Sequence, residues 1–412
     1  MNRPPEHSAW ILAACRTGIA PANGALAEFE LHELVAANWR ASGFDAGMVE
    51  AWILGNGLAA GGNPARLCLL AAGFKESVPG LTVDTQCCSG LDAIGLAASR
   101  IAAGEYQCLV AGGAESASNA PLRARRLQDG ELSFYTEARF SPNAQSPSMT
   151  QAARALAQGL EESALFEYAI ESHRRVLASD APERLKTFDD AALGRDHHPR
   201  ILTQALCARG ESNSVHNPAT MAPLSDGACL LLLCSSGMVT KLRSRGAFGA
   251  GGARPLARVL FHRSVGADPS QPALAIHALL PSLEAIWPKE PLQAQEPMQP
   301  QEPMQPQEPK RPQDSAQPEA SLPIAVELME SFSAQAIVNR RALMEWADRR
   351  RLSLEINPNG GLLALGHPIG ASGAVLVARL AHRLKPGQLG LALIASAGGL
   401  ASAILLQGVG HD

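Results

Sequence analysis

The chain of 412 residues is long enough for two or three domains and a large buried core. Its hydrophobic fraction is 46% but its aromatic fraction is only 4%, so Ala, Leu, Ile and Val must build that core. A formal net charge of −4 without a basic tract argues against nucleic acid as a partner. The sequence also lacks a run of about eighteen apolar residues, which argues against a membrane span.

The cysteines and the first residues bear on the location of the protein. The eight cysteines show neither a C-x-x-C motif nor a regular framework, which favours free thiols in a reducing compartment. Met1 to His7 lack the apolar core of a signal peptide. We therefore expect a cytoplasmic protein.

Short apolar runs alternate with helical patterns along the first part of the chain. Strands are expected at Trp10–Ala14 and Ala51–Leu54. An amphipathic helix is expected at Glu28–Ala41, with Gly43 beyond its end. A further helix begins near Pro64, because proline is favoured in a first helical turn. This alternation predicts an α/β fold.

The segment from Gly55 to Gly61 is rich in glycine, which raises the alternative of a dinucleotide-binding loop. The G-x-G-x-x-G spacing is not met, and no acidic residue follows a second strand. We therefore reject that interpretation.

Two adjacent cysteines stand where an apolar run meets a helical pattern. Pro79–Val83 leads to Cys87 and Cys88, and the Ala-rich segment Leu91–Ala103 predicts a buried helix that Gly104 ends. Unpaired N–H groups and the positive end of the helix dipole favour a thiolate at Cys87. The alternative is two inert cysteines, since free Cys is among the most buried residue types.

A second copy of this pattern favours a reactive cysteine. The two copies share their spacings: Ser89-Gly90, Arg100 and Gly104 in the first, and Ser372-Gly373, Arg383 and Gly387 in the second. His367 stands just before the second copy, as Cys87 stands just before the first. A duplicated fold that brings the two ends together makes a Cys/His pair, which is the usual way to activate a thiol.

The chain between the two copies changes in character at Pro121 and includes helical patterns at Met149–Ala153 and Glu161–Leu177. Asp196-His197-His198 raises the alternative of a metal site. Neighbouring histidines cannot easily share one ion and no further ligand cluster stands near, so we expect a surface turn there. Ala228–Cys234 is a continuous apolar run and predicts a fully buried strand.

A repeat rich in Pro, Gln and Glu occupies about residues 288–318. Such a composition cannot build a core, so we expect a disordered or extended surface insertion. A proline-docking partner is the alternative, but a tolerated loop expansion is the favoured interpretation.

Three segments carry specific patterns. Val83 to Leu91 is close to V-N-x-x-C-x-S-G-L, Gly112 to Pro121 to G-G-x-E-x-M-S-N-A-P, and Asn357 to Gly373 to N-x-x-G-G-x-x-x-x-G-H-P-x-G-A-S-G. These motifs resemble those of the thiolase family, the acyl-CoA acyltransferases. The resemblance runs from about Arg16 to about Leu406 and covers nearly the whole chain.

The resemblance implies an α/β, thiolase-type duplicated five-layer αβαβα fold, with two β-sheets sandwiched by helices. It divides the chain into an N-terminal half (1–120), a loop domain over the coenzyme A site (121–222), a return strand and helix (223–254) and a C-terminal half (255–412). It further implies a homodimer or homotetramer, coenzyme A thioesters as substrates, and no permanently bound cofactor or metal.

The resemblance also assigns roles to residues. The acyl group is carried as a thioester on the cysteine of the first motif, here Cys87. His367 would take the Cys87 proton and later polarise the thioester carbonyl of the second substrate. Backbone N–H groups at Cys87 and at Ala397 and Gly398 would form an oxyanion hole. Substrate-binding positions of the family fall on Met149, Ala222 and Phe332.

Two catalytic positions of the family are substituted. The second family cysteine, in C-x-G-G-G-x-G, falls on Ala395 in the best register, or on Ser396 after a slip of one residue, and no cysteine follows Cys234. The asparagine of the family motif N-E-A-F falls on Met329. Neither Ala nor Met can serve as a base or hold a water for an oxyanion.

Three functions are compatible with this pattern. The first is a thiolase-like acyltransferase that makes or cleaves a carbon–carbon bond of a 3-ketoacyl-CoA. The second is an acyl-transfer or decarboxylative condensing enzyme that keeps Cys87 and His367 but does not need the second cysteine. The third is a non-catalytic subunit that stabilises an active homologue.

Overall fold

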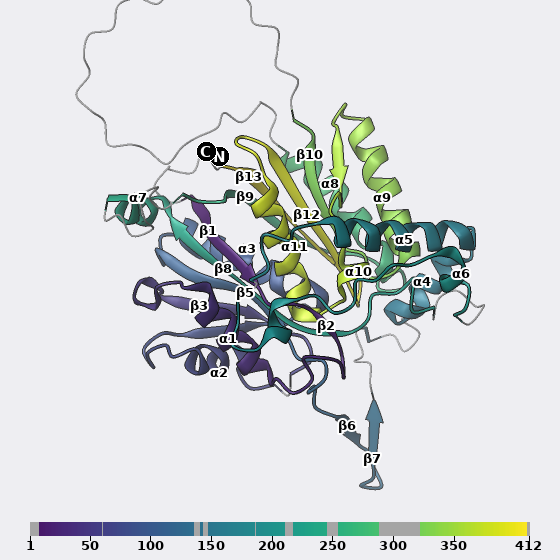
Figure 1. Cartoon of the computed structure of the whole chain (residues 1–412), viewed down its shortest axis with the longest axis horizontal. Helices are drawn as coiled ribbons and strands as arrows, with labels where there is room; N and C mark the ends of the chain where they lie inside the picture. Colours follow the sequence, from purple (N-terminus) through teal and green to yellow (C-terminus); the bar gives the residue numbers. More distant parts are fainter. Residues whose placement is uncertain are drawn as a thin grey trace, which may run out of the picture.

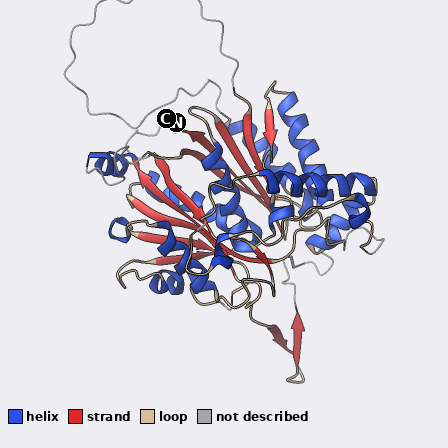
Figure 2. Cartoon of the chain, viewed as in Figure 1, coloured by secondary structure: helices blue, strands red, loops and turns tan. Residues whose placement is uncertain are grey.

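The computed structural model describes residues 8–59, 61–135, 141–142, 147–185, 187–210, 217–244, 254–287 and 322–409. The insertion expected at 288–318 lies outside these ranges. The helices and strands are arranged around one long twisted array of strands (Figures 1 and 2).

Ten strands follow one another across this array in the order β11-β10-β12-β13-β9-β1-β8-β5-β3-β4. The N-terminal half supplies β1 (Ala9–Arg16), β3 (Ala51–Gly55), β4 (Gly80–Val83), β5 (Cys108–Glu115) and β8 (Ser225–Ser235). The C-terminal half supplies β9 (Ala257–Gly266), β10 (Ile324–Leu328), β11 (Leu354–Ile356), β12 (Leu389–Ser396) and β13 (Leu400–Gly408). The short β2 (Ala20–Pro21) pairs with β8 off this path.

The two halves have the same strand topology. In the N-terminal half β4, β3 and β5 are parallel, and β8 and then β1 follow antiparallel. In the C-terminal half β11, β10 and β12 are parallel, and β13 and then β9 follow antiparallel. The duplication expected from the repeated motifs is therefore present. The two five-stranded sheets meet through a short ladder of two residue pairs between β1 and β9.

The helices complete five layers. Helices α3 (Ser89–Ala102) and α11 (Ile369–Arg383) occupy equivalent places in the two halves and pack against each other between the sheets (Figure 1). The outer face of the N-terminal sheet packs on α1 (Leu31–Ser42) and α2 (Pro64–Ala71). The outer face of the C-terminal sheet packs on α8 (Ile276–Ile286) and α9 (Ser333–Asp348). The buried apolar core lies in three sets, one between the sheets and one outside each.

The chain between β5 and β8 forms the excursion expected after Pro121. It holds the antiparallel hairpin β6–β7, which projects from the body, and three helices beside the C-terminal half (Figure 1). The elements of this region are β6 (Arg123–Arg126), β7 (Leu132–Tyr135), α4 (Met149–Ala157), α5 (Glu162–Ala178) and α6 (Gln204–Cys207). Two shorter helices complete the described chain, α7 (Ser236–Ser244) after β8 and α10 (Leu362–Leu365) before α11.

The predicted elements are largely confirmed. The helix expected from Glu28 begins at Leu31, because Glu30 and Glu33 form a capping box there, and it ends at Gly43 with a φ of 67°. Pro64 is the first residue of α2, as expected. The buried strand expected at Ala228–Cys234 extends over all of β8.

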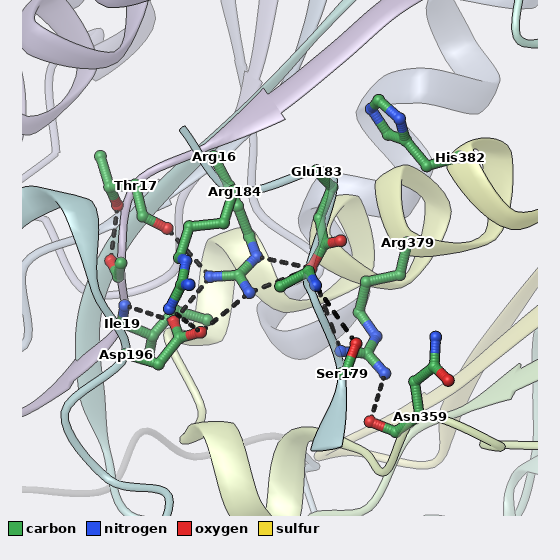
Figure 3. Close-up of polar contacts among 12 residues, drawn as sticks. Arg16, Thr17, Ile19, Ser179, Glu183, Arg184, Asp196, Asn359, Arg379 and His382 are labelled. Carbon is green, nitrogen blue, oxygen red and sulfur yellow. Dashed lines mark hydrogen bonds and ion pairs between the residues drawn. The ribbon is translucent and has the colours of Figure 1, made fainter. Parts of the chain in front are cut away.

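The surface turn expected at Asp196-His197-His198 is wrong for Asp196, whose side chain is only 5% exposed. Arg16 Nη1 donates to Asp196 Oδ1 at 2.7 Å, and Arg16 Nη2 donates to Glu183 Oε1 at 3.0 Å (Figure 3). Burial alone would raise the pKa of Asp196, but the charge and hydrogen bonds of Arg16 hold it below its usual value. Asp196 therefore stays ionised inside the protein.

This ionic cluster joins three parts of the chain. Arg16 ends β1, Glu183 and Asp196 lie in the excursion, and Arg379 lies on α11 (Figure 3). Arg379 Nε donates to Glu327 Oε2 at 3.0 Å, and its Nη1 lies 4.0 Å from Glu183 Oε1. The cluster thereby fixes the excursion against both halves.

We predict that Arg16→Ala lowers the free energy of unfolding by about 3–5 kcal/mol, because removing one partner of a buried ion pair leaves buried charge uncompensated. Chemical denaturation followed by circular dichroism measures the change. The matched control is Arg174→Ala, since Arg174 forms an exposed ion pair with Glu171 and its loss should leave the transition in place. Equal midpoints for the two variants would contradict the prediction.

Candidate active site

Cys87 lies at the junction between the edge strand β4 and the central helix α3. Gln86–Cys88 forms one 3-10 turn that runs directly into α3. Gln86 has a φ of 56°, a left-handed conformation that few residues other than glycine adopt. This strained turn places Cys87 at the N-terminal end of α3, as the sequence predicted, where it is 7% exposed.

His367 lies at the equivalent junction of the second half, just before α11. Its backbone N–H donates to the Pro223 carbonyl at 2.8 Å, and its carbonyl accepts from Ser225 N–H at 3.2 Å. Gly366, with a φ of 110°, allows the chain to turn into this position after α10. The return segment thus holds the backbone of His367 from both sides.

The two residues meet in the buried centre of the protein. Cys87 Sγ and His367 Nε2 lie 3.1 Å apart. Ser372 Oγ donates to the Pro368 carbonyl at 3.0 Å and lies 2.6 Å from His367 Nδ1. Because its single hydrogen is used, the hydroxyl accepts from Nδ1–H, which leaves the Nε2 lone pair facing the thiol. His367 is therefore oriented as a base toward Cys87.

Burial keeps both members of this pair neutral. Desolvation raises the pKa of the Cys87 thiol to about 12 and lowers the pKa of His367 to about 4. The nearby Ser396 side chain and the backbone N–H groups of Cys87 and Ala397 act in the opposite direction on the pKa of the thiol. The two backbone N–H groups donate to the sulfur and so favour negative charge at this point.

The structure distinguishes the two candidates for the position of the second cysteine. Side chains alternate between the faces of β12, so Ala395 and Ser396 point in opposite directions. Ala395 packs in the outer core of the C-terminal half. Ser396 Oγ donates to the Thr85 carbonyl at 3.0 Å, beside the turn that carries Cys87. Ser396 therefore faces the reactive centre.

The remaining predicted residues lie in different surroundings. Met329 is fully buried in the same central core as Cys87. Phe332 and Met149 pack together in a separate apolar cluster formed with α4. Ala222 donates its N–H to the Ser331 carbonyl at 2.9 Å, next to Phe332. Gly398, with a φ of 80°, lies in the turn between β12 and β13.

Glu115 is a member of this centre to which the sequence analysis gave no role. Its carboxylate accepts from Gly370 N–H at 2.9 Å, Gly57 N–H at 3.0 Å and Asn56 Nδ2 at 2.8 Å. Burial raises its pKa to about 7 despite these donors. Glu115 joins the end of β5 to the start of α11 and thereby supports the approach of the two halves. Its place in the segment Gly112 to Pro121 was the available signal.

In the described ranges, no group of three or more His, Cys, Asp or Glu side chains is arranged to hold a metal ion. Those ranges also contain no helix with the length and apolar character needed to cross a bilayer.

Comparisons with known proteins agree with this architecture. The thiolase N-terminal domain family matches residues 9–191, and the thiolase C-terminal domain family matches residues 322–408. YhfS of Bacillus subtilis (strain 168), which carries the provisional name acetyl-CoA C-acetyltransferase, is 32% identical over 97% of this chain and 99% of its own. VraB of Staphylococcus aureus (strain MRSA252), with the same provisional name, is 29% identical over 86% of each chain.

Two solved structures are similar over almost their full length. The acetyl-CoA acetyltransferase of Bacillus anthracis aligns with a TM-score of 0.75 at 25% identity, covering 98% of this chain and 99% of that one. A thiolase from Ascaris suum in complex with coenzyme A aligns with a TM-score of 0.74 at 26% identity, covering 97% and 100%.

We predict that Ser372→Ala lowers the rate of alkylation of Cys87 by iodoacetamide about 10-fold, since one hydrogen bond that fixes the imidazole is lost. Mass spectrometry of the Cys87 peptide follows the reaction. Ser244→Ala is the matched control, because Ser244 Oγ donates to the Lys241 carbonyl on the exposed side of α7. An unchanged rate in Ser372→Ala would show that Ser372 does not set the tautomer of His367.

Proposed function

Because the chain belongs to the thiolase family, we propose that it is an acyltransferase that carries an acyl group of coenzyme A as a thioester on Cys87. The observation that carries this proposal is the 3.1 Å contact between Cys87 Sγ and His367 Nε2. A buried thiol beside an oriented base is the arrangement that nucleophilic catalysis requires.

The acylation step follows from these two groups. Cys87 Sγ attacks the carbonyl carbon of the acyl-CoA while its proton passes to His367 Nε2. The carbonyl π bond opens, and the backbone N–H groups of Cys87 and Ala397 stabilise the resulting oxyanion. When the oxyanion collapses, the bond to the coenzyme A sulfur breaks and that sulfur takes the proton from His367. The products are acyl-Cys87 and free coenzyme A.

Carbon–carbon bond formation needs a carbanion from the second substrate. Removal of a proton from acetyl-CoA requires a base near Cys87, and loss of a general base typically costs ~10²–10⁴ in rate. Ser396 faces that position, but its hydroxyl has too high a pKa to serve and its hydrogen is given to the Thr85 carbonyl. Met329 adds a buried apolar side chain where the family has an amide.

We therefore favour a decarboxylative condensation. In a malonyl-type thioester the bond to the carboxylate breaks, carbon dioxide leaves, and the electron pair forms the enolate without a base. The enolate attacks the carbonyl carbon of acyl-Cys87, and the Cys87 thiolate leaves and takes a proton from solvent. His367, which has returned its proton to coenzyme A, is then not needed as a base in this step.

Acylation is the first test of the proposal. We expect the full chain incubated with acetyl-CoA to gain one acetyl group, which peptide mapping by mass spectrometry places on Cys87. Cys87→Ser should lose the adduct, whereas Cys88→Ala, one residue away, should keep it. An adduct that survives in Cys87→Ser would refute the nucleophile. No adduct with any acyl-CoA would favour the non-catalytic subunit.

Substrate choice is the second test. We expect condensation from acetyl-CoA alone to be slower by about 10²-fold or more than condensation from acetyl-CoA with malonyl-CoA, because the base is missing. Chromatography of the acyl-CoA products measures both rates. Rapid acetoacetyl-CoA formation or thiolysis without a malonyl donor would show that another group acts as the base.

Restoring the family residues is the third test. Met329→Asn with Ser396→Cys should raise condensation from acetyl-CoA alone, since a thiol can accept the proton that a serine hydroxyl cannot. The matched control is Met329→Asn with Ala395→Cys, because Ala395 points into the outer core. A gain with Ala395→Cys and none with Ser396→Cys would overturn the assignment of Ser396 to this position.

A further inference from the structure

A partly buried polar cluster lies behind Cys87, between α3 and the C-terminal sheet. It comprises Asp92, Thr85, His262, Ser264 and Ser402, which we call the Asp92 cluster. Asp92 lies in the first turn of α3 and is 9% exposed. Thr85 immediately precedes the turn that carries Cys87. The remaining three side chains come from β9 and β13 of the other half.

Each oxygen of the Asp92 carboxylate has partners. Oδ2 accepts from Thr85 Oγ1 at 2.6 Å. Oδ1 accepts from Ser264 Oγ at 2.7 Å and lies 2.8 Å from His262 Nε2. Ser402, the residue paired with Ser264 across the two strands, has its Oγ 2.9 Å from Ser264 Oγ. The C-terminal half therefore holds one oxygen of Asp92, and the nucleophile segment holds the other.

The Asp92 carboxylate stays charged in this environment. Burial alone would raise its pKa, but hydrogen bonds from His262, Thr85, Ser402 and Ser264 bring it below its usual value. A charged acceptor makes stronger and shorter hydrogen bonds than a neutral one, which fits the 2.6 Å contact with Thr85.

Thr85 passes this restraint to the turn of Cys87. Its N–H donates to Ser89 Oγ at 2.9 Å, and its carbonyl accepts from Ser396 Oγ at 3.0 Å. With the bond from Oγ1 to Asp92, every polar group of Thr85 has a partner. The next residue, Gln86, has the left-handed φ of 56°, which persists only where surrounding contacts fix the chain.

We propose that Asp92 is a positioning residue for Cys87: through Thr85 it fixes the left-handed turn that directs the Cys87 sulfur at His367 Nε2. This inference rests on the proposed role of Cys87 as the nucleophile. Because β9 and β13 hold Asp92, the C-terminal half sets the geometry of the nucleophile as well as that of the base.

The test is the alkylation rate of Cys87 by iodoacetamide in the full chain, which requires no acyl-CoA. Asp92→Asn and Thr85→Val, each close in shape to the native residue, should slow alkylation about 10-fold, whereas Thr85→Ser, which keeps the hydroxyl, should stay within about 2-fold of the native rate. Ser99→Ala on α3 is the matched control, since Ser99 Oγ bonds only within its helix. Melting temperatures are recorded for every variant.

A second comparison separates positioning from general support of the fold. In a His367→Asn background the sulfur no longer has a base to face, so adding Asp92→Asn should cause no further loss of the alkylation rate. A full additional loss in that background would overturn the proposal, because Asp92 would then act independently of His367. Native rates in Asp92→Asn and Thr85→Val, or equal losses in Thr85→Val and Thr85→Ser, would overturn it as well.

Failure of the proposed function is distinguishable from failure of this inference. If alkylation follows the expected pattern while no acyl-CoA acylates Cys87, Asp92 still positions the thiol and the acyl-transfer proposal fails. If acylation occurs normally in Asp92→Asn and Thr85→Val, the acyl-transfer proposal stands and the positioning role is lost.

Discussion

The contact between Cys87 and His367 is the interaction on which the rest of the structure depends. Neither half contains both residues, and each residue lies where its half enters the central helix layer, at α3 and α11. The sheets, the packing of these two helices and the bonds of Glu115 to both halves bring the junctions together. The duplicated topology is thus the means by which a thiol and an imidazole more than half the chain apart come within 3.1 Å.

Burial then decides the chemistry of the pair. A desolvated thiol and a desolvated imidazole are both more stable as neutral groups, so proton transfer must accompany attack on a substrate. Backbone donors compensate at the point where charge develops, because the N–H groups of Cys87 and Ala397 donate to the sulfur. Met329 and Ser396 are also fully buried, and neither side chain can act as a base. In the proposed function this favours a second substrate that forms its carbanion by losing carbon dioxide.

Much of the fold and of the reactive pair could be predicted from the sequence, because the repeated Ser-Gly…Arg…Gly spacing signals duplication and the junction residues stand beside it. Contacts between segments that are distant in the sequence could not be predicted in this way. The buried role of Asp196 depends on Arg16, 180 positions away, so the sequence around Asp196 gives no sign of its ion pair. Whether Ala395 or Ser396 takes the position of the second cysteine depends on which face of β12 meets the Cys87 turn. A shift of one residue in the alignment exchanges the two faces. The Asp92 cluster is assembled from three separate segments of the chain and has no local motif.

The most direct test of this account is a titration of the imidazole nitrogens of His367 by NMR, with His367→Asn identifying its signals. The account predicts a neutral ring at pH 7 with its proton on Nδ1, held by Ser372, and protonation only as the pH falls toward about 4. Because the pKa of His367 in the folded protein is lowered to about 4, the neutral base persists above about pH 4 and is lost below it. An imidazolium at pH 7, or a neutral ring with its proton on Nε2, would contradict the assignment of His367 as the base that faces Cys87.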